Sequence, residues 1–151
     1  AVMHWIPDQK LVAERVFRAL KPGGRFVLEF GGKGCNKIIF GALDEEIRRR
    51  GYEPHPVFFF RSIGEYAPVL ESAGFRVESA WLFDRDTLLE GADGMLNFLN
   101  MFSCNILANV PESERDPIFR SVVDRIRAVS FRDGVWHADY VRLRVVARKP
   151  L

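Results

Sequence analysis

The chain has 151 residues, of which 48% are hydrophobic and 28% charged, with a formal net charge of +2. This length suits one domain with a real core and not two, so we expect a single domain over residues 1–151. The charge is small and the arginines are scattered among acids, which indicates no nucleic-acid partner. No apolar run is long enough to cross a bilayer, and two cysteines are typical of reduced thiols in a cytoplasmic protein.

The first thirty residues predict a strand, a helix and a second strand. Residues 1–6 are short, apolar and uninterrupted, as expected for the end of a buried parallel strand. Asp8 is a competent N-cap for a helix over residues 9–20. A Lys-Pro-Gly-Gly turn at 21–24 then leads into a strand over residues 25–30, with its aromatic side chains on one face.

A loop and two further helices follow. The glycine-rich loop at 31–34 lacks the spacing of a phosphate-binding P-loop, and a second helix runs from it to about Arg50. Ser62 and Glu65 have the spacing of a capping box. Two courses remain open for that third helix. Either it starts at Ser62 with Pro68 inside, or its regular part starts near Pro68.

The middle of the chain predicts a strand and then a helical insertion. Residues 75–84 alternate as in a strand, and residues 88–130 form the insertion. Within the insertion, residues 95–107 are apolar nearly all round a helix, which predicts burial on more than one side. An amphipathic helix begins near residues 111–116, and we expect it to bury an apolar face that extends to Val129.

The C-terminal part carries the longest strand signal of the chain. After a turn at Asp133-Gly134, residues 137–147 alternate apolar side chains with Arg142 and Arg144. Two arginines on one face predict a half-exposed, antiparallel strand near the edge of a sheet.

Five motifs occur in an order and spacing that carry a family resemblance. They are HWIPD at 4–8, LKPGG at 20–24 continuing to Glu29, EY with LESAGF between 65 and 75, the segment 87–102, and DYVRLR at 139–144. Together they resemble the later part of a class I S-adenosylmethionine-dependent methyltransferase, of the small-molecule kind that includes trans-aconitate methyltransferases. The resemblance implies an α/β fold with a partial doubly wound, Rossmann-like sheet and a helical insertion before the last strand.

The resemblance also implies a cofactor site made by the carboxyl ends of two neighbouring strands. His4 and Trp5 end one strand, and Glu29 and Phe30 end the next, so these four residues are expected to face S-adenosylmethionine. Two interpretations of His4 stay open. It is either a catalytic base toward the methyl acceptor or a hydrogen-bonded residue in the wall of the site. The family's glycine-rich cofactor turn has no match in this sequence, so the chain resembles the C-terminal half of the enzyme and binding of the cofactor by it alone is doubtful.

The insertion corresponds to the part of the family that covers the substrate. Trp81, Phe98, Met101 and Phe102 are therefore expected to line a lid over a small-molecule acceptor. The apolar stripe at 95–102 is equally typical of a core or an interface, and this alternative stays open.

Two functions are consistent with these patterns. The first is methyl transfer to a small carboxylate- or hydroxyl-bearing molecule. The second is a truncated, catalytically inactive module that acts only in assembly or binding, and the two differ in whether a glycine-rich turn accompanies this chain. An exposed edge at residues 1–6, or swapped elements, predicts a homodimer. We expect no membrane partner and no metal, because His4, His55 and His137 show no ligand spacing.

Overall fold

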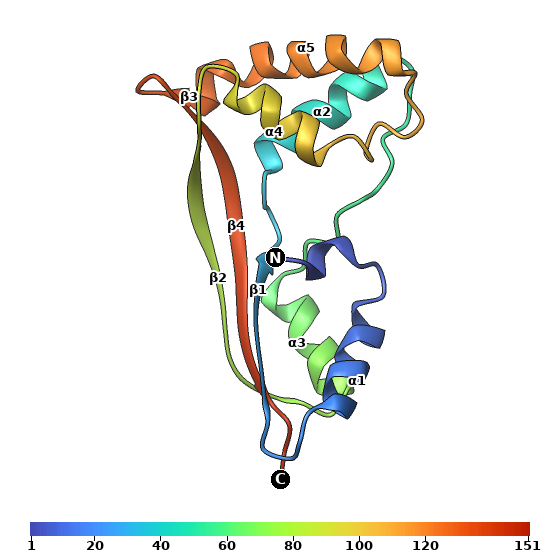
Figure 1. The fold of residues 1–151 in the computed structure, drawn as a ribbon, viewed down its shortest axis with the longest axis vertical. Coiled ribbons are helices and arrows are strands. Elements are labelled where there is room, and N and C mark those ends of the chain that lie inside the picture. The colour runs from blue at the N-terminus through green and yellow to red at the C-terminus, as the bar shows by residue number, and fades with distance from the viewer. The chain divides into compact units, whose positions relative to one another are not determined.

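The computed structural model describes all 151 residues as a mixed α/β fold (Figure 1). In chain order the elements are η1 (Met3–Trp5), α1 (Gln9–Ala19), β1 (Arg25–Gly31), α2 (Lys37–Arg49), α3 (Ile63–Ser72), β2 (Arg76–Leu89), α4 (Gly94–Phe102), α5 (Glu112–Ser130), β3 (Phe131–Arg132) and β4 (Val135–Arg148). The sheet order is β1-β4-β2, β3 also pairs with β4, and the β1–β4 and β3–β4 ladders are antiparallel. None of the helices combines the length and apolar character that crossing a membrane requires.

Contacts between residues divide the chain into two compact units. The first comprises Ala1–Cys35, Phe58–Arg85 and Val141–Leu151, and the second comprises Asn36–Val57 and Asp86–Tyr140. The first unit contains η1, α1, α3 and β1, and the second contains α2, α4, α5 and β3. Strands β2 and β4 contribute residues to both units.

The core of the first unit lies between its strands and the helices α1 and α3, which pack on one another (Figure 1). The β1–β4 register places Phe30 opposite Leu143 and Leu28 opposite Val145. Phe30 and Leu143 are fully buried, and Val145 nearly so. Burying an aliphatic or aromatic side chain of this size stabilises a fold by about 1.5–3 kcal/mol. The predicted apolar face of residues 25–30 is therefore confirmed.

The predicted helix ends of the first unit are confirmed in detail. The Asp8 carboxylate accepts a hydrogen bond from the Leu11 N–H at 2.9 Å and caps α1. Ser62 and Glu65 form the reciprocal capping box of α3. Of the two alternatives for this helix, the structure shows the longer one, with Pro68 inside α3.

The core of the second unit is built by α2 and α4 packing on α5 (Figure 1). The Glu46 carboxylate of α2 is buried at this contact and accepts hydrogen bonds from Arg49 at 2.7 and 2.9 Å and from Arg50 at 2.9 Å. A hydrogen-bonded ion pair satisfies a charge that would otherwise be costly to bury. On the same helix Glu45 pairs with Arg125 of α5 at 2.8 Å.

The expected strand at residues 1–6 is wrong, because this segment contains a 3-10 helix, Met3–Trp5. Its backbone groups bond locally, from the Trp5 N–H to the Val2 carbonyl and from the Ile6 N–H to the Met3 carbonyl. Local bonds satisfy these polar groups without a neighbouring strand. The edge that these residues were expected to offer for dimerisation is therefore not a strand edge.

The position expected for the C-terminal strand is also corrected. Strand β4 is antiparallel, as predicted, but it lies between β1 and β2 and not near an edge. Arg144 is half exposed, with 52% of its side chain accessible, and it pairs across the ladder with Glu29 at 2.6 Å. Arg142, by contrast, is mostly buried, with 15% of its side chain exposed. The predicted half-exposed face is thus confirmed at Arg144, and only the position near an edge is wrong, because an inner strand of an antiparallel sheet can also face water on one side.

Two helices of the insertion differ from expectation. The helix expected over 95–107 ends at Phe102, and Met101 is 72% exposed, so this helix is not buried all round. Val129 of α5 was expected on a buried face, but it is 56% exposed. Strand β2 continues to Leu89, beyond its expected end. Periodicity marks the apolar positions of a helix but not which of them meets a neighbour.

The buried carboxylate of Glu46 yields a stability prediction. The hydrogen bond from Arg49 outweighs burial and, with that from Arg50, lowers the pKa of Glu46 to about 2. Glu46→Gln should lower the free energy of unfolding by about 1–3 kcal/mol at neutral pH, in urea titrations. Because the folded-state pKa lies below the unfolded value of 4.5, this contribution should be lost as the pH falls from 4.5 toward 2.

The neighbouring Glu45 provides the matched control for that experiment. Its side chain is 74% exposed, and it also pairs with an arginine. Glu45→Gln should change the free energy of unfolding by less than about 0.5 kcal/mol, because exposed ion pairs contribute little. Equal effects of the two substitutions would contradict the assignment of Glu46 as the buried anchor of α2.

Candidate active site

His4 lies in the first unit, where the 3-10 helix η1 meets the end of β1. Its ring is buried, with the residue 8% exposed, and Nδ1 accepts a hydrogen bond from the backbone N–H of Gly31 at 3.1 Å. The His4 carbonyl in turn accepts a hydrogen bond from the Phe59 N–H at 2.8 Å. His4 is thus bonded at both its ring and its backbone to segments that are distant in sequence.

The hydrogen bond from Gly31 determines what the His4 ring can do chemically. Because Nδ1 is an acceptor there, the neutral ring carries its proton on Nε2 and offers a donor at that atom. Burial first, and then the positive charge of Arg142, lower the pKa of His4 to about 4. At neutral pH the ring is therefore uncharged. This geometry favours a hydrogen-bonded wall residue, and the role of His4 as a base stays a prediction.

Three aromatic rings surround the His4 imidazole. Phe60 stacks on it with ring centroids 5.4 Å apart, Trp5 lies at 5.7 Å and Phe58 at 6.0 Å. Trp5 also meets Phe58 edge-on, with centroids 4.5 Å apart. Such an aromatic group presents electron-rich faces, which attract cations by about 0.5–2 kcal/mol. The structure thus combines the predicted pair His4 and Trp5 with two phenylalanines.

Gln9 is the positioning residue that sequence reasoning missed. Its amide is 1% exposed, and Nε2 donates to the Met3 carbonyl at 2.9 Å and to the Phe59 carbonyl at 3.1 Å. Its Oε1 accepts a hydrogen bond from Arg61 Nε at 2.6 Å. Gln9 thereby fixes both segments that carry the aromatic rings. The only signal in the sequence was a polar residue at the start of a helix, which is ordinary.

The other two residues expected at the cofactor are engaged with neighbours. The Glu29 carboxylate accepts a hydrogen bond from Arg144 Nε at 2.7 Å, and Arg85 and Arg142 approach it at 3.8 and 3.9 Å. Phe30 is fully buried and meets Tyr66 edge-on, with centroids 4.9 Å apart. A cofactor contact of Phe30 would therefore come from its backbone. Both assignments stay predictions.

The residues expected to form a lid are distributed over both units. Trp81 belongs to the first unit and is 51% exposed. Phe98 and Phe102 belong to the second unit, with ring centroids 5.0 Å apart, and Phe98 is 5% exposed. Met101 is mostly exposed, as noted above. Phe98 also packs near Phe40 and Tyr140, which makes it part of an aromatic core within that unit.

No protein-family profile matches the chain. An uncharacterized methyltransferase of Schizosaccharomyces pombe is 31% identical over 159 residues, covering 99% of this chain and 60% of that protein. The chain is therefore similar over nearly its whole length to a protein described as a methyltransferase. Phosphoethanolamine N-methyltransferase 2 of Caenorhabditis elegans is 22% identical over 87% of this chain and 28% of its own length.

Solved structures share the fold. A provisionally named methyltransferase of Bacillus halodurans matches 99% of this chain and 61% of its own, with a TM-score of 0.57 and 18% identity. Loganic acid methyltransferase, solved with SAH, matches 99% of this chain and 53% of its own, with a TM-score of 0.54 and 15% identity. The chain thus spans about 60% or less of the length of these methyltransferases.

The buried, uncharged His4 yields a prediction on pH. Its folded-state pKa of about 4 lies below the ordinary histidine value of 6.5, so the unfolded chain binds more protons between these values. The contribution of the neutral His4 ring to the free energy of unfolding should be fully present above pH 6.5. The free energy of unfolding should then fall by up to about 3 kcal/mol as the pH drops toward 4. Urea titrations across this range, with NMR titration of the imidazole, measure both quantities.

The histidine variants complete this test. His4→Gln should remove that part of the pH dependence. The matched variant His55→Gln, at an exposed position, should retain it. A His4 resonance that titrates near pH 6.5 would show that the ring is not held in this buried environment.

The close approach of Gly31 to Phe60 yields a second prediction. A Cβ at position 31 would lie 2.6 Å from the Phe60 ring. Gly31→Ala should therefore displace this ring, shift the His4 NMR signals and cost about 1–3 kcal/mol of stability. Gly41→Ala in α2 is the control. Its Cβ would meet nothing within 4 Å, and it should stabilise the protein by about 0.5–1 kcal/mol. An unperturbed His4 signal in Gly31→Ala would contradict this packing.

Proposed function

We propose that this chain takes part in S-adenosylmethionine-dependent methyl transfer to a small carboxylate- or hydroxyl-bearing molecule. The observation that carries the proposal is 31% identity over 99% of the chain to a methyltransferase. In this proposal the enzyme is of the trans-aconitate methyltransferase kind. Its doubly wound sheet includes β1, β2 and β4, together with a glycine-rich cofactor turn that none of these 151 residues matches.

The residues around His4 support the cofactor side of the proposal. When bound, S-adenosylmethionine supplies the methyl group from a positively charged sulfonium. Trp5 and Phe58 present aromatic faces of the kind that attract such a cation. The Nε2–H of His4 is a donor for a carboxylate or hydroxyl oxygen, and Gln9 holds both ring-bearing segments in place. These residues therefore fit roles in binding and orientation, which dominate an in-line displacement.

The second unit supports the acceptor side. In the proposal the insertion at residues 88–130 covers a small molecule and excludes water from it. The pair Phe98 and Phe102 supplies apolar surface, and the exposed Met101 is a flexible apolar side chain on the same helix. Trp81 is an exposed aromatic residue for the same purpose. The identity of the acceptor is set by side chains of this kind.

An inactive module that acts in assembly or binding is the second candidate. It differs from the first candidate in that no glycine-rich cofactor turn accompanies these 151 residues in the protein. A homodimer is the partner proposed with it. The outer strands of the sheet order, β1 and β2, are the edges available for such pairing.

Calorimetric titration of the purified chain with S-adenosylmethionine and S-adenosylhomocysteine distinguishes the two candidates. If the chain carries enough of the cofactor site, binding should be saturable. Trp5→Ala should then weaken binding of S-adenosylmethionine about tenfold and that of the uncharged product less, because only the former is a cation.

The control is Val129→Ala, at a position that is 56% exposed in the second unit, and it should leave both affinities unchanged. Absence of binding to either compound would favour the assembly module. Equal losses for both compounds in Trp5→Ala would contradict the cation–π role of Trp5.

A further inference from the structure

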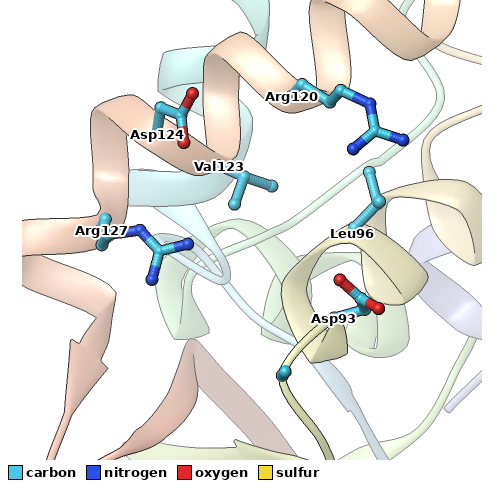
Figure 2. A pocket seen from close by; sticks show the side chains of 7 residues that line it. Asp93, Leu96, Arg120, Val123, Asp124 and Arg127 are labelled. Carbon is cyan, nitrogen blue, oxygen red and sulfur yellow. The ribbon is translucent and has the colours of Figure 1, made fainter.

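A small pocket lies within the second unit between α4 and α5, away from His4 and the aromatic residues around it. Its volume is about 170 Å³, and its lining includes Asp93 and Leu96 on the α4 side and Arg120, Val123 and Arg127 on α5. This space equals about six water molecules, taking roughly 30 Å³ for each in the liquid. Figure 2 shows Arg120 and Arg127 leaving α5 with Val123 between them, while Asp93 and Leu96 face them.

The guanidinium of Arg127 packs over aromatic rings and makes no ion pair. Its guanidinium lies 5.0 Å from the ring centroid of Trp136 and 5.3 Å from that of Phe131. Trp136 is fully buried, and its Nε1–H donates to the carbonyl of Ala92, another lining residue, at 2.8 Å. Stacking on the rings fixes the plane of the guanidinium. Its N–H groups point outward along the edge of that plane and stay available to donate hydrogen bonds. Arg127 is therefore a positioned cation with unused donors.

The carboxylates of the pocket act on Arg120 only through longer-range electrostatic attraction. Asp93 is the N-cap residue of α4, but its side chain makes no capping hydrogen bond. Neither Asp93 nor Asp124 forms an ion pair. Arg120 is held by Asp116 at 2.7 Å, and the charges of Asp93 and Asp124 add to this contact in raising the pKa of Arg120. The lining thus offers one unpaired cation and two unpaired anions around an apolar floor.

We propose that this pocket binds a small zwitterion of the amino-acid type with an apolar side chain. The ligand carboxylate bonds to Arg127, whose planar fork suits two parallel N–H···O bonds. The ligand ammonium lies toward Asp93, and the apolar side chain packs on Val123 and Leu96. A simple anion is disfavoured because the two aspartates repel it, and a simple cation is disfavoured by the two arginines. This site is independent of the proposed methyl transfer.

L-Leucine is the probe for this site, with two analogues that each lack one charge. 4-Methylpentanoate keeps the carboxylate and 3-methylbutylamine keeps the ammonium. In ¹H–¹⁵N spectra of the 151-residue chain, L-leucine should shift the signals of Asp93, Leu96 and Val123 saturably. Its affinity should exceed that of either analogue at least about tenfold, because each analogue leaves one charged partner unmatched. No saturable shift, or equal affinities for L-leucine and either analogue, would overturn the proposal.

Two variants separate binding from folding. Arg127→Gln should weaken L-leucine binding about tenfold or more, but it also removes the stacking on Trp136. Asp93→Asn preserves the shape of the side chain and breaks no capping hydrogen bond of α4. It should weaken L-leucine and leave 4-methylpentanoate unweakened. Arg15→Gln, at an exposed position of α1, is the control and should bind L-leucine as the unmodified chain does. Unchanged L-leucine affinity in Asp93→Asn would contradict the zwitterion.

Discussion

The antiparallel ladder between β1 and β4 is the constraint on which the first unit depends. It joins Arg25–Gly31 to Arg142–Arg148 and sets the apolar face that α1 and α3 cover. The same register places Glu29 opposite Arg144 on the other face, so burial and ion pairing are satisfied together. A slip of one residue would exchange the two faces and expose the core, which is why this register is strongly specified.

The ladder also fixes the candidate site. Gly31 is the last residue of β1, and its backbone N–H is the donor that the His4 ring accepts. The residue at this position must lack a Cβ because the Phe60 ring occupies that space. The strand end, the imidazole and the stacked ring are therefore one arrangement. The neutral state of His4 follows from this burial more than from any single charge.

Local signals predicted the elements whose ends are encoded by a few residues. The Asp8 cap, the capping box at Ser62 and the Asp133-Gly134 hairpin turn were all read from sequence because their chemistry is local. The resemblance predicted the relationship to methyltransferases. The sequence pattern failed where strands distant in the sequence decide the arrangement, as for β4, which was expected near an edge but lies between β1 and β2. The Gln9 contacts were beyond reach for the same reason, since their partners lie up to 52 residues away.

Those Gln9 contacts restrict which side chain position 9 can hold. Its amide uses two donors and one acceptor at once, all within an enclosed space. Glutamate would turn an oxygen toward the Met3 and Phe59 carbonyls, asparagine is one methylene shorter, and an apolar residue would satisfy none of the three groups. Natural variants that keep this arrangement should therefore retain glutamine here. A different residue at this position would mark a relative in which the segment before α1 takes another course.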